Sequence, residues 1–209
     1  MFSNKSVAIQ SDVQRVTKHL DLGCGSTPRN PFGATELHGI DIGDRLANEV
    51  GNVLFTKANL ILNPIPYQDN YFDSVSAYDF LEHIPQLICR DGNTELPFVR
   101  LMNEIYRVLN HNGVFYAVPP LFPKESAFVD PTHVNYISRD TYKYFVQPHH
   151  WASMYGFTGK FHCERAEVVN FAYETRKSTG LKKVICKLSH TLYPKLKQHI
   201  VWHFLTIKA

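Results

Sequence analysis

The chain has 209 residues, of which 44% are hydrophobic and 20% are charged, a composition typical of a folded globular protein. No apolar run approaches the roughly 20 residues of a membrane-spanning helix, and residues 1–10 lack the apolar core of a secretion signal. The four cysteines are far apart and form no Cys-x-x-Cys pair, so neither a zinc ribbon nor a disulfide framework is expected. These features favour a cytoplasmic protein.

The net charge of +3 is unevenly distributed along the chain. No acidic residue follows Glu174, whereas eight Lys and Arg residues do, so the C-terminal segment is basic and the remainder is slightly acidic. The uniformly basic surface of a nucleic-acid-binding protein is therefore not expected. Residues 181–188 fit either a basic amphipathic helix in peripheral contact with an anionic membrane or, as we favour, a solvated helix before the last strand.

Predicted strands alternate with loops and helices, which indicates an α/β fold with a largely parallel sheet. Strands are expected at residues 16–22, 37–42, 53–57, 71–78, 114–118, 160–173 and 201–207. Apolar residues at three- and four-residue spacing predict a helix over 97–109, which residues 111–113 would end as a left-handed cap. Shorter helices are expected near 142–145 and 151–155. We expect a single domain over residues 1–209, with a cofactor half at about 15–120, a substrate-side elaboration at about 121–158, and C-terminal strands with the basic segment at 159–209.

The residues between the first two strands predict a nucleoside pocket. Residues 21–25 read Asp-Leu-Gly-Cys-Gly, and Asp41 ends the second strand. In an open α/β sheet, such glycines let a ligand approach the backbone, and an acidic residue at this second position accepts hydrogen bonds from ribose. Pro28 stands where a dinucleotide fingerprint needs its third glycine, which removes the helix N-terminus that binds a pyrophosphate. An NAD-dependent reductase is therefore disfavoured.

Five segments in order resemble the class I S-adenosylmethionine-dependent methyltransferases, in particular their small type-11-like branch associated with small-molecule and polysaccharide biosynthesis. These segments are residues 20–25, 39–42, 66–75, 78–84 and 104–113. The resemblance covers about residues 15–120. It implies a Rossmann-like, doubly wound, seven-stranded, mostly parallel sheet with an antiparallel last strand, S-adenosyl-L-methionine as the cofactor, and methyl transfer as the reaction.

The resemblance also implies roles for individual residues. The glycine loop would lie against the methionine part of the cofactor, Asp41 would bind the ribose, the residues after strand three would flank the adenine, and residues 78–80 would face the sulfonium. The cofactor-binding residues expected on this basis are Asp21, Gly23, Cys24, Gly25, Asp41, Ile42, Asn59, Leu60, Tyr78, Asp79 and Phe80. The ring of Tyr78 is expected to stabilise the sulfonium cation, and Cys24 to pack as a small residue.

The sequence departs from the family pattern at two places. Asn59 stands where the family usually has Asp; its amide oxygen can still accept a hydrogen bond from the adenine amino group, more weakly. A loop at residues 26–35 replaces the first helix, as in a branch of these enzymes.

Acceptor chemistry is expected after strand five, where residues 130–133 resemble a segment of sugar-modifying methyltransferases. Transfer to a hydroxyl needs a base, usually a histidine. His133 is our candidate base, with Asp130 to orient it or to accept from a sugar hydroxyl; the alternative is that His133 only fixes the loop. His83 is the rival base, with a structural role as its alternative. Glu82 is expected to be structural or solvent-facing. No metal site is expected, because the neighbouring His149 and His150 would point to different helix faces.

The acceptor itself stays open. We favour a hydroxyl of a sugar or surface-glycan precursor. The alternatives are N-methylation of a small amine, such as an aminoalcohol phosphate, and an inactive cofactor-binding partner of another methyltransferase. The expected partner is thus a small-molecule acceptor and not a nucleic acid, since the Asp/Asn-Pro-Pro-aromatic motif of nucleic-acid amino-methyltransferases is missing after strand four. The sequence makes no prediction of oligomeric state.

Overall fold

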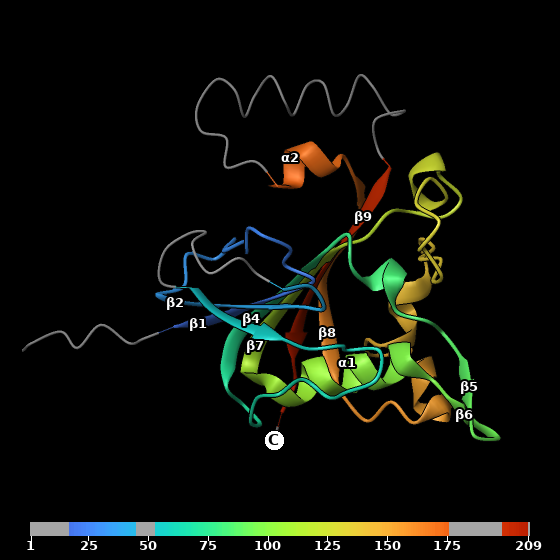
Figure 1. Ribbon diagram of the computed structural model, residues 1–209, viewed down its shortest axis with the longest axis horizontal. Helices are drawn as coiled ribbons and strands as arrows, with labels where there is room; N and C mark the ends of the chain where they lie inside the picture. Colours follow the sequence, from blue (N-terminus) through green and yellow to red (C-terminus); the bar gives the residue numbers. More distant parts are fainter. Residues whose placement is uncertain (1–16, 45–52, 176–197, 209) are drawn as a thin grey trace, which may run out of the picture.

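The computed structural model describes residues 17–44, 53–175 and 198–208 (Figure 1). Within them, one sheet has seven strands in the order β3-β2-β1-β4-β7-β9-β8. Their bounds are β1 Lys18–Leu22, β2 Glu36–Asp41, β3 Val53–Lys57, β4 Phe72–Tyr78, β7 Leu109–Val118, β8 Phe161–Val169 and β9 His199–Thr206. The first four of these and β7 pair in parallel, and β9 is antiparallel to both of its neighbours. The predicted doubly wound sheet with an antiparallel last strand is confirmed.

Three boundaries differ from the prediction. Helix α1 spans Pro97–Val108 and passes directly into β7, because Leu109 is already extended. Residues 111–113 therefore do not cap the helix: they belong to an irregular part of β7, where Asn112 has φ 56° and the pairing register with β4 shifts. The strand predicted over 160–173 ends at Val169, and Phe171–Thr175 form helix α2. The Asn170 side chain accepts a hydrogen bond from the Ala172 N–H at 2.9 Å and so starts this helix.

The remaining elements are short. A hairpin of β5 (Ile88–Arg90) and β6 (Asn93–Glu95) turns at Asp91 and Gly92, both with positive φ. 3₁₀ helices cover Leu81–His83, Glu125–Ala127, Thr141–Tyr144 and Trp151–Tyr155. The described residues include no helix long and apolar enough to cross a membrane. The basic segment at 181–188 lies outside the described residues.

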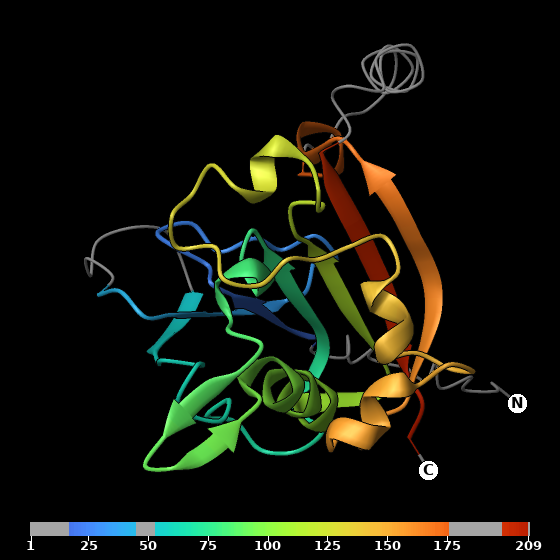
Figure 2. The same cartoon turned by 90° about the vertical axis from the view of Figure 1, so that its right-hand side faces the viewer.

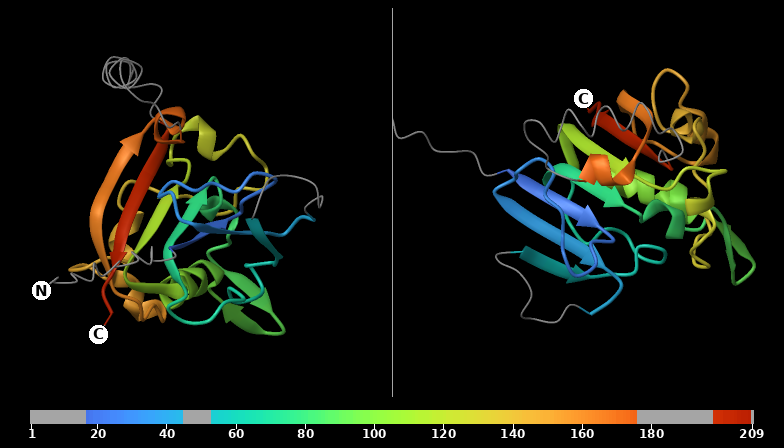
Figure 3. Two further views of the ribbon diagram at one scale, coloured as in Figure 1. Left: turned by 90° about the vertical axis from the view of Figure 1, so that its left-hand side faces the viewer. Right: turned by 90° about the horizontal axis from the view of Figure 1, so that it is seen from above.

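Alternation along the strands divides the sheet into two faces that bury different elements. Phe115 and Ala117 of β7 belong to the core under α1, whereas Val118 and Tyr116 pack with Phe171 of α2. Helix α1 buries its predicted apolar stripe in the first face, and each of its large apolar side chains contributes about 1.5–3 kcal/mol by burial. The two helices lie on opposite sides of the sheet, as Figure 3 shows.

The loop expected in place of the first helix is present, and it covers the α2 side of β1. Residues 26–35 form neither helix nor strand. The ring of Phe32 lies 5.9 Å from both the His19 and the Tyr116 rings, and the Arg29 guanidinium lies 4.6 Å above the Tyr78 ring. Phe32 and Arg29 thus cover the face of the sheet that the first helix would otherwise cover.

After β7 the chain crosses the carboxyl ends of the parallel strands. Figure 2 shows this segment, residues 121–147, running across the molecule before it reaches β8. Pro120 bridges to His199, and Leu121 bridges to Ile137, so the segment is attached to β9 at one end and folds back on itself. This placement puts it over the edge of the sheet where open α/β folds bind ligands.

Candidate active site

A cavity of about 670 Å³ lies at the carboxyl ends of four adjacent strands. Its walls come from the segments that directly follow β1, β2, β3 and β4. The lining residues from these segments are Gly23, Ile40, Asp41, Ile42, Ala58, Asn59, Leu60, Ile61, Asp79 and Phe80. A cavity of this size is typical for a small-molecule cofactor, and seven of the residues predicted to bind the cofactor line it. We call it the cofactor cavity.

Gly23 is required by both its conformation and its surroundings. Its φ is +62°, a region that side-chain-bearing residues avoid, and a Cβ at this position would lie 2.3 Å from Cδ2 of Phe80. Gly25 has φ +55°, but a Cβ there would meet no atom within 4 Å. The first glycine therefore makes room beside the Phe80 ring, and the second provides the turn.

Asp41 is held in place at the mouth of the cofactor cavity by two backbone amides. Its Oδ2 accepts from the Gly25 N–H at 2.9 Å, and its Oδ1 accepts from the Gly43 N–H at 2.9 Å. Each carboxylate oxygen keeps a further lone pair for an outside donor. The residues present thus fit the ribose of a nucleoside cofactor, whose two neighbouring hydroxyls would find a fixed carboxylate.

Apolar residues of the cofactor cavity suit an adenine ring. Leu60, which is 5% exposed, and Ile42, which is 61% exposed, both line the cavity and follow the neighbouring strands β3 and β2. The Asn59 Oδ1 accepts a hydrogen bond from the Ile61 N–H at 3.0 Å. The amide oxygen expected to accept from adenine is therefore already used once within its own loop.

Four predicted cofactor residues do not line this cavity: Asp21, Cys24, Gly25 and Tyr78. Asp21 and Cys24 are buried and support the glycine loop from below; the Asp21 Oδ2 accepts from the Arg29 N–H at 2.8 Å. Tyr78 is only 4% exposed and packs on the α2 side of the sheet, with Arg29 over its ring. Our expectation that this ring faces the sulfonium needs correction, because β4 turns the side chain to the other face.

A second cavity of about 450 Å³ adjoins the first and shares Asp79 and His83 with it. Its other described lining residues are Glu82, Pro120, Glu125, Ser126, Val129, Asp130, His133, Gln198 and His199. With Asp79 and His83 included, the described lining has four carboxyl side chains and three histidines, and it includes no Lys or Arg. We call it the acceptor cavity. Both predicted base candidates and Asp130 belong to it.

Neighbouring groups determine the tautomers of the two histidines. The His133 Nδ1 lies 3.1 Å from the Ala127 carbonyl oxygen and must donate to it. The Thr132 hydroxyl donates to Asp130 Oδ1 at 2.7 Å, so it accepts from the His83 Nδ1 at 3.0 Å. Each ring therefore carries its proton on Nδ1 and its lone pair on Nε2. The ring centroids are 4.9 Å apart.

Of the two alternatives predicted for Glu82, structural or solvent-facing, the structure contradicts the second. Glu82 is 1% exposed, so it does not face solvent, and within the described residues neither of its carboxylate oxygens has a hydrogen-bond partner. Its Oε1 lies 3.9 Å from the His133 Nε2. Burial raises the pKa of the Glu82 carboxyl to about 8. Its position directly before His83 in a short helix was the available sequence signal.

A further pair at this site was not predicted at all. The His199 Nε2 lies 3.0 Å from Asp79 Oδ1, and Asp79 has φ 44°. His199 begins β9 and comes 120 positions after its partner, so no local pattern connects the two. This contact fixes the side chain of Asp79, which lines both cavities.

The comparisons with known proteins agree with this geometry. Residues 20–117 match the family described as methyltransferase domain, and no curated protein matches the sequence. A S-adenosylmethionine-dependent methyltransferase from Archaeoglobus fulgidus is similar at 17% identity and a TM-score of 0.54, over 91% of this chain and 86% of that one. Another, from Mesorhizobium loti, has 12% identity and a TM-score of 0.55, over 91% and 92%.

A third similar chain comes from the complex between the Haloferax volcanii Trm112 methyltransferase activator and a methyltransferase. It has 11% identity and a TM-score of 0.58, over 95% of this chain and 85% of that one. At these identities the solved structures support the fold, and the domain match covers slightly less than half of the chain. The cavity beside Gly23 and Asp41 and the sheet topology agree with the match of residues 20–117 to a methyltransferase domain.

Proposed function

We propose that the protein transfers a methyl group to a hydroxyl of a small polyol, such as a sugar or glycan precursor, bound in the acceptor cavity. The observation that carries this proposal is the contact between the two cavities at Asp79 and His83. A reactant in the acceptor cavity would meet the cofactor at this shared wall. Holding the two reactants in line is the main contribution that an enzyme makes to methyl transfer.

The lining of the acceptor cavity favours a neutral, hydroxyl-rich molecule. Carboxylates accept hydrogen bonds from sugar hydroxyls, whereas they repel phosphates, and the described lining has no Lys or Arg to offset that repulsion. This argues against a phosphate group inside the cavity and so against an aminoalcohol phosphate bound there.

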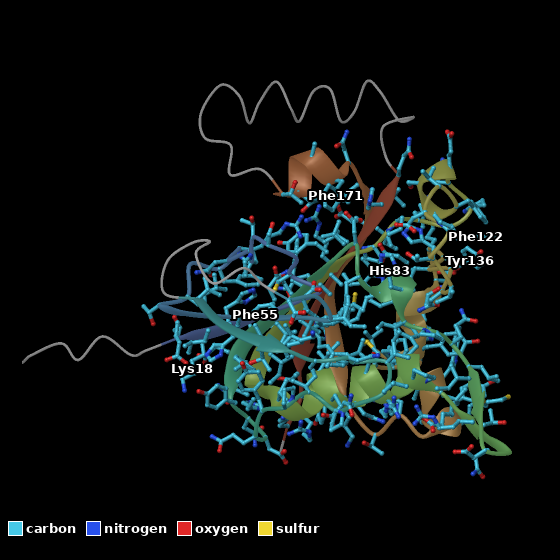
Figure 4. All side chains as sticks on the ribbon, viewed as in Figure 1. Lys18, Phe55, His83, Phe122, Tyr136 and Phe171 are labelled. Atoms are coloured by element: carbon cyan, nitrogen blue, oxygen red, sulfur yellow. The ribbon has the colours of Figure 1, made fainter. Side chains whose placement is uncertain are left out.

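An aromatic cluster close to this cavity suits the apolar face of a sugar ring. Phe122, Phe128 and Tyr136 have ring centroids 5.2–5.9 Å apart and are 40–50% exposed. Phe128 directly precedes the cavity residue Val129 in the chain. Figure 4 shows Phe122 and Tyr136 on the side of the molecule that carries His83. Exposed aromatic faces of this kind stack against the C–H face of a ring or against a cation.

S-adenosylmethionine supplies a methyl group on a positively charged sulfur. In the transfer, the acceptor oxygen would form a bond to the methyl carbon, the sulfur–carbon bond would break with its electron pair left on sulfur, and the hydroxyl proton would be released. Residues of the chain must orient the hydroxyl, keep water out and take up that proton. His133 is our candidate to receive it on Nε2, and Asp130 orients the loop through Thr132.

A second candidate function is methylation of a small amine. The observation that favours it is the set of acidic lining residues other than Glu82, namely Asp79, Glu125 and Asp130, which would also attract an ammonium group. An amine, unlike a hydroxyl, reacts once it has lost its proton to solvent. The two functions therefore differ in whether the enzyme must provide a base.

The test is a panel of acceptors incubated with radiolabelled S-adenosylmethionine, including neutral sugars, amino sugars, nucleotide sugars and aminoalcohol phosphates. We expect label in neutral or amino sugars, and loss of that label in the His133→Ala protein. His162→Ala provides the matched control, because His162 lies on β8 and is 59% exposed in its side chain. Labelling of phosphorylated acceptors alone would contradict the proposed acceptor class.

A further inference from the structure

One three-residue cluster in the acceptor cavity has the composition of a metal site. Glu82, His83 and His133 each offer one ligand atom, and these atoms lie within 4.8 Å of one another. The set contains one carboxylate and two imidazoles, which together bind first-row divalent metals while leaving coordination positions open.

We propose that Glu82, His83 and His133 bind a divalent transition-metal ion, on which the acceptor hydroxyl is placed for methyl transfer. The inference rests on the proposed function for its role in the reaction, whereas the binding of the ion can be tested without any acceptor. It revises the expectation from the sequence that the chain has no metal site.

The hydrogen bonds around the two histidines are those of metal ligands. A ligating imidazole usually donates its second N–H to a backbone carbonyl or a carboxylate, which fixes the tautomer and the ring orientation. His133 donates to the Ala127 carbonyl, and His83 donates to Thr132, whose hydroxyl donates in turn to Asp130. Both Nε2 lone pairs are thereby available before any ion arrives.

Glu82 provides the independent observation that a cation belongs here. Its side chain lines the acceptor cavity, it is 1% exposed, and neither oxygen has a hydrogen-bond partner within the described residues. An ionised carboxylate without a partner is costly to bury, typically by several kcal/mol, so such a group either keeps its proton or binds a cation. The His133 Nε2 lies 3.9 Å from the Glu82 Oε1, which is too far for a hydrogen bond.

The ligand set decides the class of ion. Mg²⁺ and Ca²⁺ prefer oxygen-only sites, whereas two imidazoles favour Zn²⁺, Co²⁺ or another first-row transition metal. Ligand atoms around such an ion lie about 3–3.5 Å apart, so the three side chains must move together slightly as the ion binds.

A hydroxyl bound to the ion would lose its proton more readily than a free hydroxyl. With the ion present, His133 would be a ligand, and the released proton would go to solvent. The four carboxylates of the acceptor cavity would also offset the positive charge of the ion. The bonds formed and broken in the transfer are those given above.

The test uses Co²⁺, which reports its coordination by visible absorption, added to the metal-stripped full chain. We expect one Co²⁺ site in the wild type that is lost, or weakened at least 10–100-fold, in the Glu82→Gln and His133→Gln proteins. His162→Gln is the matched control: His162 and Glu164 form an exposed pair at 3.4 Å on β8, and this variant should bind as the wild type does. Binding of S-adenosylhomocysteine by each variant verifies the fold, since neither Glu82 nor His133 lines the cofactor cavity.

Equal Co²⁺ binding by the wild type and both variants would overturn the proposal. So would full methyl transfer by the metal-stripped enzyme to an acceptor from the panel, since the ion would then have no part in the reaction. The two proposals fail separately: a Co²⁺ site without any methylated acceptor removes the proposed function, whereas methyl transfer without a Co²⁺ site removes the metal.

Discussion

His19 and Asp21 are connected by a single hydroxyl group, that of Ser76. The Ser76 Oγ donates to Asp21 Oδ1 at 2.6 Å and therefore accepts from the His19 Nε2–H at 2.9 Å. The Ser74 hydroxyl, 2.7 Å away, donates to the His19 Nδ1. All of these side chains lie on the α2 side of β1 and β4, under the loop that replaces the first helix. The histidine in this arrangement is neutral.

The pKa values of His19 and Asp21, at the two ends of this network, are shifted in opposite directions. Burial lowers the pKa of His19 to about 4 and raises the pKa of Asp21 to about 6. Between pH 4 and 6.5 the unfolded chain binds a proton at His19 that the folded chain does not, so the histidine makes stability rise with pH. Between about pH 4 and 6 the folded chain keeps a proton on Asp21 that the unfolded chain has lost, so the aspartate makes stability fall with pH.

We therefore expect the two single variants to show opposite pH dependence relative to the wild type. From pH 4 to 6, Asp21→Asn should gain stability relative to the wild type, and His19→Gln should lose it, each by an amount on the order of 2–3 kcal/mol. Urea unfolding at several pH values measures both. The comparison uses the slope of the unfolding free energy against pH. The loss of a hydrogen bond in each variant changes that free energy by the same amount at every pH and so does not affect the slope. Parallel slopes for the two variants would show that the network does not titrate in this way.

Gly23→Ala should weaken cofactor binding far more than Gly25→Ala. Both glycines have positive φ, which costs an alanine about 1–2 kcal/mol, but only the Cβ at position 23 overlaps the Phe80 ring. Calorimetry with S-adenosylhomocysteine measures the difference. Adding Phe80→Leu to Gly23→Ala should restore part of the affinity. If the two alanine variants bind equally, the close approach to Phe80 has no role in shaping the cavity.

Asp41→Ala should weaken cofactor binding by about 1.5–3 kcal/mol, because it removes a charged acceptor for the ribose hydroxyls. Asp44→Ala is the matched control. Asp44 lies three residues later and forms an exposed ion pair with Lys57, so its loss should change the affinity little. The measurement is again calorimetry with S-adenosylhomocysteine. An equal effect of both variants would mean that general negative charge, and not a bond to ribose, is responsible.

Asn59→Asp should bind the cofactor as well as the wild type or better. The amide oxygen of Asn59 already accepts from the Ile61 N–H, whereas a carboxylate would keep that bond and offer a second, charged oxygen to the adenine amino group. S-adenosylhomocysteine affinity is the readout, with inosine-containing analogues, which lack the amino group, as the control. A clear loss of affinity would show that the Asn59 NH₂ group makes the contact instead.

The sequence predicted the cofactor half of the molecule more completely than the acceptor half, for a physical reason. Gly23 and Asp41 lie at the ends of neighbouring parallel strands, and such ends always meet at one edge of the sheet. The acceptor cavity joins segments that are far apart: Asp79 meets His199 across 120 positions, and Glu82 meets His133 through a segment without regular structure. Only long-range packing brings these residues together.

The smaller errors have local causes. Alternation puts Tyr78 on the face opposite to the apolar core under α1, but the sequence alone does not say which face a strand-end residue adopts. The Asp91-Gly92 turn is a recognisable hairpin signal, and the residues on either side of it are too few and too polar to read as strands. Asn112 has the left-handed φ that a helix cap needs, but it lies within β7, so the predicted cap at residues 111–113 is wrong.

His133→Ala tests the acceptor side most directly. His133 lines the acceptor cavity and not the cofactor cavity, so S-adenosylhomocysteine affinity should be unchanged. Turnover on a hydroxyl acceptor should fall by about 10²–10⁴-fold, because the hydroxyl proton then has neither a base nor a ligated metal ion to promote its removal. On an amine acceptor the fall should be smaller and should disappear at higher pH, where solvent has already deprotonated the amine. Steady-state rates of the wild type, His133→Ala and His162→Ala on the best acceptor from the panel separate these cases. A wild-type rate for His133→Ala at every pH would exclude His133 from the reaction and leave His83 as the histidine to test next.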